Sequence, residues 1–141
     1  MQTTTAKRAV LFIRVNHRGV GSPRTAAALT ERQRAIGQTV ADQLGASIVR
    51  EYIDSGGAVR VEDRVELQTM LDDLADMGNI DYVIASDQTR LSRNAADYVE
   101  ILHAVQAAGA LIATPAIVAK GEPEEVYFCN PSLTYERRIS L

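Results

Sequence analysis

The sequence predicts an α/β fold, a three-layer sandwich in which helices cover both faces of a central, mostly parallel sheet of four or five strands. Short apolar runs rich in β-branched residues alternate along the chain with longer segments whose apolar residues recur every three or four positions. This repeated strand-then-helix order is typical of parallel strands joined by right-handed crossovers. A length of 141 residues with 46% hydrophobic content suits a single core.

The first half of the chain contains two of the predicted strands and one helix. The run AVLFIRV at 9–15 is almost entirely apolar, as in a strand buried on both faces. After a glycine-containing loop, Thr30 and Gln33 have the spacing of a capping box, which predicts that a helix begins at Thr30. Gly45 ends this helix, and the run SIVREYID at 47–54 forms the second strand.

The second half repeats the same units. Arg64 opens a helix that ends at Gly78, and the strand YVIAS follows at 82–86. Asn94 caps another helix, and ALIATP at 110–115 supplies a fourth strand. Each of these helices has one apolar face, formed by Leu67, Met70, Leu71 and Leu74 in the first and by Tyr98, Ile101, Leu102 and Val105 in the second.

The pattern weakens after residue 115. The run EEVYFC at 124–129 is a candidate fifth strand, and TYERRISL at 134–141 is at most the first turns of a helix. We therefore expect a flexible N-terminus at 1–8 and a single domain over 9–141.

Composition restricts the classes of function. A net charge of −3 and a pI near 5.4 argue against a chain that coats nucleic acid through bulk charge, so any DNA contact must be local. Cys129 is the single cysteine, which excludes an internal disulfide, and Asp54 lacks the clustered partners of a metal site; we expect no metal and no cofactor. With no run of 18 apolar residues and no signal core, the chain is expected to be cytoplasmic, without membrane contact.

Arginines leave the carboxyl ends of the predicted strands, where ligands bind in folds of this class. Arg14 and Asn16 end the first strand on the same side. Arg90 and Arg93 follow the third strand and would share a face if that segment is helical. Arg64 lies at a helix N-terminus, where a positive charge is unfavourable. The arginines either converge on an oxyanion such as phosphate or are solvated and pair with nearby acids: Glu62, Asp63 and Asp87.

Several sequence pieces occur in a fixed order between residues 9 and 115: a strand ending in R-V, a glycine-containing loop, then L-T-E-R-Q, D-S-G, D-R-V-E-L and T-R-L-S-R. This arrangement resembles the catalytic domain of the serine site-specific recombinases, the resolvase and invertase family. The resemblance implies a domain in which a serine attacks a DNA phosphodiester to give a phosphoserine intermediate.

The resemblance assigns site residues position by position. Arg14 matches the arginine of the family's aromatic-x-R-V-S pattern, and Asn16 stands where that pattern has the serine. Arg90 and Arg93 match the arginines of D-R-L-x-R, whereas Thr89 replaces its aspartate. These positions are the implied catalytic residues, together with Arg64, which matches the arginine near the start of the second helix. The implied phosphate or DNA contacts are Arg14, Arg64, Arg90, Arg93 and Gln33, the last matching the glutamine of S-L-x-x-Q.

Two of these substitutions remove chemical groups. A serine hydroxyl can lose its proton and later be displaced from phosphorus, whereas the carboxamide oxygen of Asn16 is a poor nucleophile. A carboxylate at position 89 would transfer protons or hold an arginine, and the hydroxyl of Thr89 does neither well near neutral pH. Asp87 could replace that carboxylate if the strand continues to it, and Ser22 could supply a displaced nucleophile.

We therefore expect a resolvase/invertase-type catalytic-domain homologue that is deficient in strand cleavage, a pseudoenzyme that keeps an arginine-lined phosphate site. Its expected partners are DNA, bound weakly or with a partner's help, and either a second copy of the chain in a homo-oligomer or a full-length recombinase. A C-terminal DNA-binding domain is not expected, because the chain ends at ERRISL. One alternative is an active truncated DNA recombinase with a non-standard nucleophile or a partner-supplied domain. Another is a binder of a small phosphorylated ligand.

Overall fold

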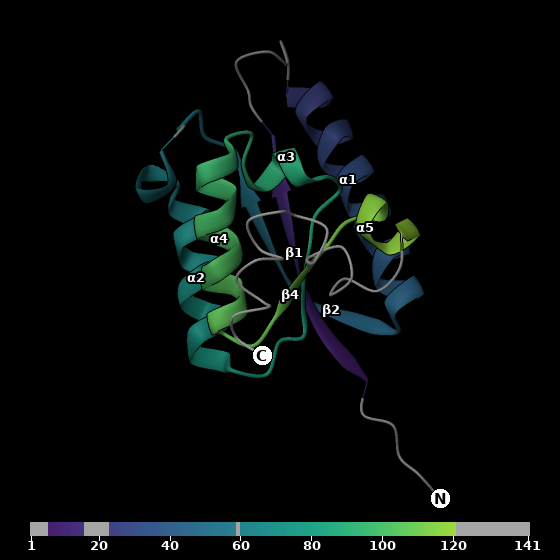
Figure 1. Ribbon diagram of the computed structural model, residues 1–141. Coiled ribbons are helices and arrows are strands. Elements are labelled where there is room, and N and C mark those ends of the chain that lie inside the picture. The colour runs from purple at the N-terminus through teal and green to yellow at the C-terminus, as the bar shows by residue number, and fades with distance from the viewer. Residues whose placement is uncertain (1–5, 16–22, 59, 121–141) are drawn as a thin grey trace, which may run out of the picture.

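The protein has a parallel sheet covered by helices on both faces (Figure 1). The computed structural model describes residues 6–15, 23–58 and 60–120. Within them the sheet has four strands in the order β2-β1-β3-β4, and each neighbouring pair is parallel. The strands are β1 (Lys7–Arg14), β2 (Ala46–Asp54), β3 (Tyr82–Ile84) and β4 (Leu111–Ala113). The predicted fold class is confirmed.

The helices form the two outer layers of the sandwich (Figure 1). On one face lie α1 (Pro23–Leu44) and α5 (Pro115–Lys120), and on the other lie α2 (Val65–Met77) and α4 (Ala95–Ala107). The short helix α3 (Gln88–Leu91) lies at the carboxyl end of the sheet, near the last residues of β1. A 3-10 turn, Val61–Asp63, leads into α2.

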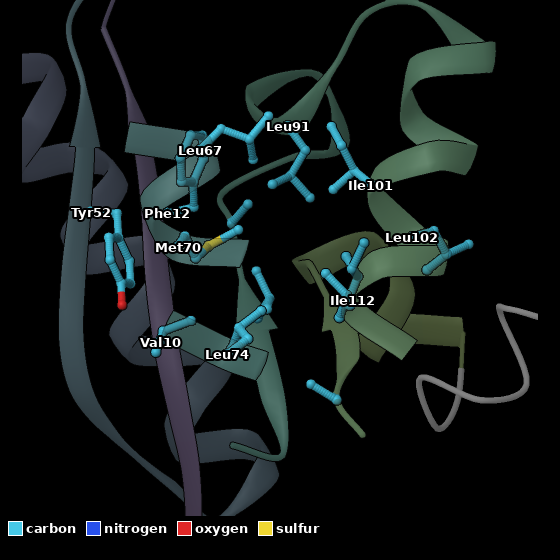
Figure 2. Packing of buried hydrophobic residues seen from close by; sticks show 14 of the residues in the cluster. Val10, Phe12, Tyr52, Leu67, Met70, Leu74, Leu91, Ile101, Leu102 and Ile112 are labelled. Carbon is cyan, nitrogen blue, oxygen red and sulfur yellow. The ribbon is translucent and has the colours of Figure 1, made fainter. Parts of the chain in front are cut away.

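Strand β1 is buried on both faces because its side chains alternate between the two layers. Val10 and Phe12 pack into the cluster under α2 and α4, which Figure 2 shows in close-up. Leu11 and Ile13 point the other way, into the cluster under α1. All four side chains are fully buried, so the apolar run that predicted this strand is explained by its central place in the sheet.

Helix α1 begins seven residues earlier than the sequence predicts. Its first residue is Pro23 and not Thr30, in agreement with the preference of proline for the first helical turn. Thr30 lies inside the helix, where its hydroxyl donates to the carbonyl of Ala26 at 2.9 Å. The predicted capping box is therefore wrong, because Thr30 bonds within the helix and Gln33 has a partner in another element.

Several other boundaries differ from the prediction. Strand β1 begins at Lys7, so two residues of the segment expected to be flexible belong to the sheet. Strands β3 and β4 end at Ile84 and Ala113, before the predicted ends at 86 and 115. Pro115 begins α5, which the sequence did not predict. The candidate fifth strand at 124–129 and the candidate helical turns at 134–141 lie outside the described residues.

Two buried tyrosines predict that the protein loses stability in alkaline solution. The pKa of Tyr52 is raised to about 12, mainly by burial and also by the hydrogen bond that its hydroxyl donates to Asp73 at 2.7 Å. Burial also raises the pKa of Tyr98 to about 12. Since an unfolded tyrosine ionises near 10, the unfolded state loses protons first as the pH rises from 10 towards 12.

The expected result is a contribution of the two tyrosines to the free energy of unfolding that is constant below their unfolded pKa and falls as the pH rises towards the folded value. Chemical denaturation at a series of pH values measures it. The double substitution Tyr52→Phe with Tyr98→Phe should make this fall shallower. An equal fall in both proteins would contradict the prediction.

Candidate anion-binding site

Arg14 ends β1 directly beside the end of β2, because the register of the two strands pairs it with Asp54. Its Nε lies 3.6 Å from Oδ2 of Asp54. Its Nη2 donates to the carbonyl of Ala58 at 2.5 Å, in the segment that follows β2. The central strand therefore places a partly buried guanidinium at the carboxyl end of the sheet.

Gln33 holds the main chain of this strand end. Its Oε1 accepts the backbone N–H of Arg14 at 3.0 Å, and its Nε2 donates to the carbonyl of Arg14 at 2.9 Å. The side chain is buried, with only 3% of the residue exposed. Helix α1 is thus tied to the last residue of β1 by two hydrogen bonds from one amide.

Arg64 is the most buried of the predicted site arginines, with 1% of its side chain exposed. Its Nε donates to Oδ2 of Asp54 at 3.0 Å, and its Nη1 and Nη2 donate to the carbonyls of Leu91 and Arg90, the second at 3.0 Å. The guanidinium carbon lies 5.6 Å from the ring centre of Phe12. Burial lowers the pKa of Arg64, and the nearby charge of Arg14 lowers it further. The alternative of a solvated arginine is wrong at this position.

Asp54 joins the two arginines, a role that the sequence analysis missed. The residue is 5% exposed, and one of its oxygens, Oδ2, lies within ion-pair distance of both Arg14 and Arg64. Its other oxygen accepts the N–H of Gly56 at 3.3 Å. The only signal in the sequence was the position of an acid at the last residue of a strand, and the register of β1 and β2 decides what that acid meets.

The segment after β3 turns into α3 and does not continue as a strand. Asp87 is the N-cap of α3 and accepts the N–H of Thr89 at 2.9 Å. Arg90 lies in the helix, with its Nε 3.3 Å from Oδ2 of Asp87. Arg93 lies beyond the helix end at Leu91, so a shared helical face does not relate the two arginines.

Several of the predicted site residues line a pocket of about 280 Å³ at the carboxyl end of the sheet. The structure brings together five of the predicted site residues in its wall: Arg14, Arg64, Thr89, Arg90 and Arg93. Asp97, in the first turn of α4, supplies the one carboxylate among the described residues of that wall. Gln33 lines a separate pocket, and Asn16 and Ser22 lie outside the described residues.

Residues 9–127 match the model of the resolvase N-terminal domain. The chain belongs to this family. No protein of curated function matches the sequence. The resemblance that the sequence motifs indicated is confirmed at the level of the family, and the match extends beyond residue 115, where the motifs end.

Solved structures similar to this resolvase-family domain support its fold. A resolvase family site-specific recombinase from Streptococcus pneumoniae is 23% identical with a TM-score of 0.68, over 95% of this chain and 87% of that chain. The N-terminal catalytic domain of TP901-1 integrase is 16% identical with a TM-score of 0.67, over 96% and 100%. The C-terminal catalytic domain of ISC1926 TnpA, an IS607-like serine recombinase, is 22% identical with a TM-score of 0.59, over 76% of this chain and 66% of that one.

The described part of this resolvase-family domain has neither a candidate metal site nor a candidate membrane span. Among its residues, no group of three or more His, Cys, Asp or Glu side chains is placed to hold a metal ion. No helix there has the length and apolar character needed to cross a membrane.

The buried pair of Asp54 and Arg64 predicts a large, coupled effect on stability. Arg64→Met leaves the buried carboxylate with the more distant Arg14 alone, and should lower the free energy of unfolding by about 2 to 4 kcal/mol. Adding Asp54→Asn removes the charge left behind, so the double variant should be more stable than the sum of the single effects by about 1 kcal/mol or more. Denaturant unfolding of the four proteins measures this coupling, and additive effects would contradict it.

Proposed function

We propose that this resolvase-family domain binds a phosphate group of DNA in the arginine-lined pocket and is deficient in strand cleavage. The observation that carries the proposal is the convergence of arginines from β1, from the start of α2 and from the α3 segment on one pocket. Guanidinium groups suit phosphate because their planar N–H donors match two oxygens at once. The described wall holds four arginines and one aspartate, although the whole chain carries a net charge of −3.

The pocket is large enough to take a phosphate group. Its volume of about 280 Å³ is close to the lower end of the roughly 300 to 1,000 Å³ of typical small-ligand sites. A phosphate could enter it while the rest of a nucleic-acid chain stays outside. The names of the similar structures, which include site-specific recombinases, also favour DNA as the source of the phosphate.

The residues divide into two roles in this proposal. Arg14, Arg90 and Arg93 contact the phosphate. Arg64 uses its donors within the protein and Gln33 uses both ends of its amide on the main chain of Arg14, so these two act mainly by positioning. A direct phosphate contact by Gln33, as the family resemblance implied, is not part of the proposal.

The expected loss of cleavage rests on Asn16. An in-line attack on phosphorus needs an oxygen that can lose a proton, and the asparagine carboxamide has none. The hydroxyl of Thr89 also lines the pocket, but it donates its hydrogen to Asp87 within the α3 turn. The domain would then act on DNA as a binding partner, in an assembly with a second copy of itself or with an intact recombinase.

Covalent capture of DNA tests this proposal. Supercoiled and suicide-nicked DNA are incubated with the protein and with its Asn16→Ser variant, and protein–DNA adducts are resolved on a denaturing gel. We expect an adduct with Asn16→Ser and none with the unmodified protein, because this substitution returns a hydroxyl nucleophile to the arginine-lined site. Asn16→Ala serves as the matched control without a hydroxyl. An adduct with the unmodified protein would contradict the proposed deficiency.

A further inference from the structure

Asp87 fixes two residues of the arginine pocket through one carboxylate. Its Oδ1 accepts the backbone N–H of Thr89 at 2.9 Å and also accepts the hydroxyl hydrogen of Thr89. Its Oδ2 lies 3.3 Å from Nε of Arg90. Asp87 is also the N-cap of α3, so the same side chain sets the start of this helix.

The Asp87 carboxylate is not part of the wall of the arginine pocket. Thr89 and Arg90 line the pocket of about 280 Å³. Asp87 lines an adjoining pocket of about 340 Å³, and Arg90 is common to the two walls. Asp87 can therefore act on a bound phosphate in two ways, through its contacts with Thr89 and Arg90 and through the field of its charge.

The contact with Arg90 leaves most of that guanidinium for a ligand. An arginine has five N–H donors, of which Nε carries one. The Asp87 carboxylate lies within ion-pair distance of Nε, from which it accepts no hydrogen bond, and this contact does not use the two terminal nitrogens. Those nitrogens are the groups that bind two phosphate oxygens in a fork.

We propose that Asp87 is a positioning residue that supplies, from two residues upstream, the carboxylate that is absent at position 89. It orients Arg90 towards the phosphate and holds the Thr89 hydroxyl in place. This inference rests on the proposed function, because the orientation of Arg90 matters only if the pocket binds phosphate. It also means that Arg90 keeps a neighbouring carboxylate, that of Asp87, although residue 89 is a threonine.

The direction in which Asp87→Asn changes phosphate binding distinguishes a positioning role of Asp87 from a purely electrostatic one. A negative charge near an anion site repels phosphate, so its removal strengthens binding if charge alone matters. Asp87→Asn removes the charge but keeps an oxygen acceptor for the cap, since Asn and Asp are similar N-caps. If Asp87 positions Arg90, this variant binds phosphate more weakly in spite of its gain in net charge.

The experiment measures binding of a fluorescently labelled DNA duplex to the full chain by anisotropy at low salt. We expect Asp87→Asn to weaken binding by about threefold or more, as for the loss of a partly exposed charged contact. Asp76→Asn, near the end of α2 and exposed, makes the same change in net charge and should leave binding unchanged or slightly tighter.

The outcomes distinguish this inference from the function on which it rests. If the unmodified protein binds DNA and Asp87→Asn binds equally or more tightly, the positioning role is wrong and the proposed function stands. If the unmodified protein does not bind DNA at all, the proposed function and this inference are both wrong. In the Asn16→Ser background, Asp87→Asn should also lower the rate of adduct formation.

Discussion

The buried ion pair between Asp54 and Arg64 is the interaction on which the site depends. It joins the end of an edge strand to the start of α2, and Arg64 extends the connection to the α3 segment by donating to two of its carbonyls. A buried charge is costly unless it is paired and hydrogen-bonded. Arg64 meets this condition with three acceptors, while Asp54 also faces Arg14. The pair therefore fixes three separate segments around one pocket.

A positive pocket on an acidic protein follows from this arrangement. Strands β1 and β2 end side by side, and α3 lies at the same edge, so arginines from distant parts of the sequence meet there. These arginines already have partners within the protein: Gln33 bonds the backbone of Arg14, Asp54 bonds the guanidinium of Arg64, and Asp87 lies within ion-pair distance of Arg90. Such preorganisation reduces the entropy lost when an anion binds.

Local patterns in the sequence predicted most of the fold. The apolar run of β1 and the apolar stripes of α2 and α4 became buried faces, and Gly78 ends α2 in the left-handed conformation, with φ of 66°. The start of α1 was missed because a capping pattern around Thr30 also fits a helix interior. Helix α5 was missed because its six residues, Pro115–Lys120, are too few to show a helical period.

The site was harder to predict because its contacts are between residues distant in sequence. The motifs identified the arginines, but the burial of Arg64 depends on carbonyls 26 and 27 residues away. The role of Asp54 depends on strand register, and that of Gln33 on the approach of α1 to the end of β1. None of these contacts is a local property of the sequence. The identity of the site arginines could therefore be predicted, but the partners that hold them could not.

The central claim is that this pocket, and not the protein surface in general, binds phosphate. The test compares Arg93→Gln, in the pocket wall, with Arg50→Gln, which changes an exposed arginine of β2 that pairs with Asp73 of α2. Duplex binding is measured over a range of salt concentrations. Arg93→Gln should weaken binding and lower the slope of log affinity against log salt by about 1, while Arg50→Gln should change neither. Equal effects of the two substitutions would contradict it.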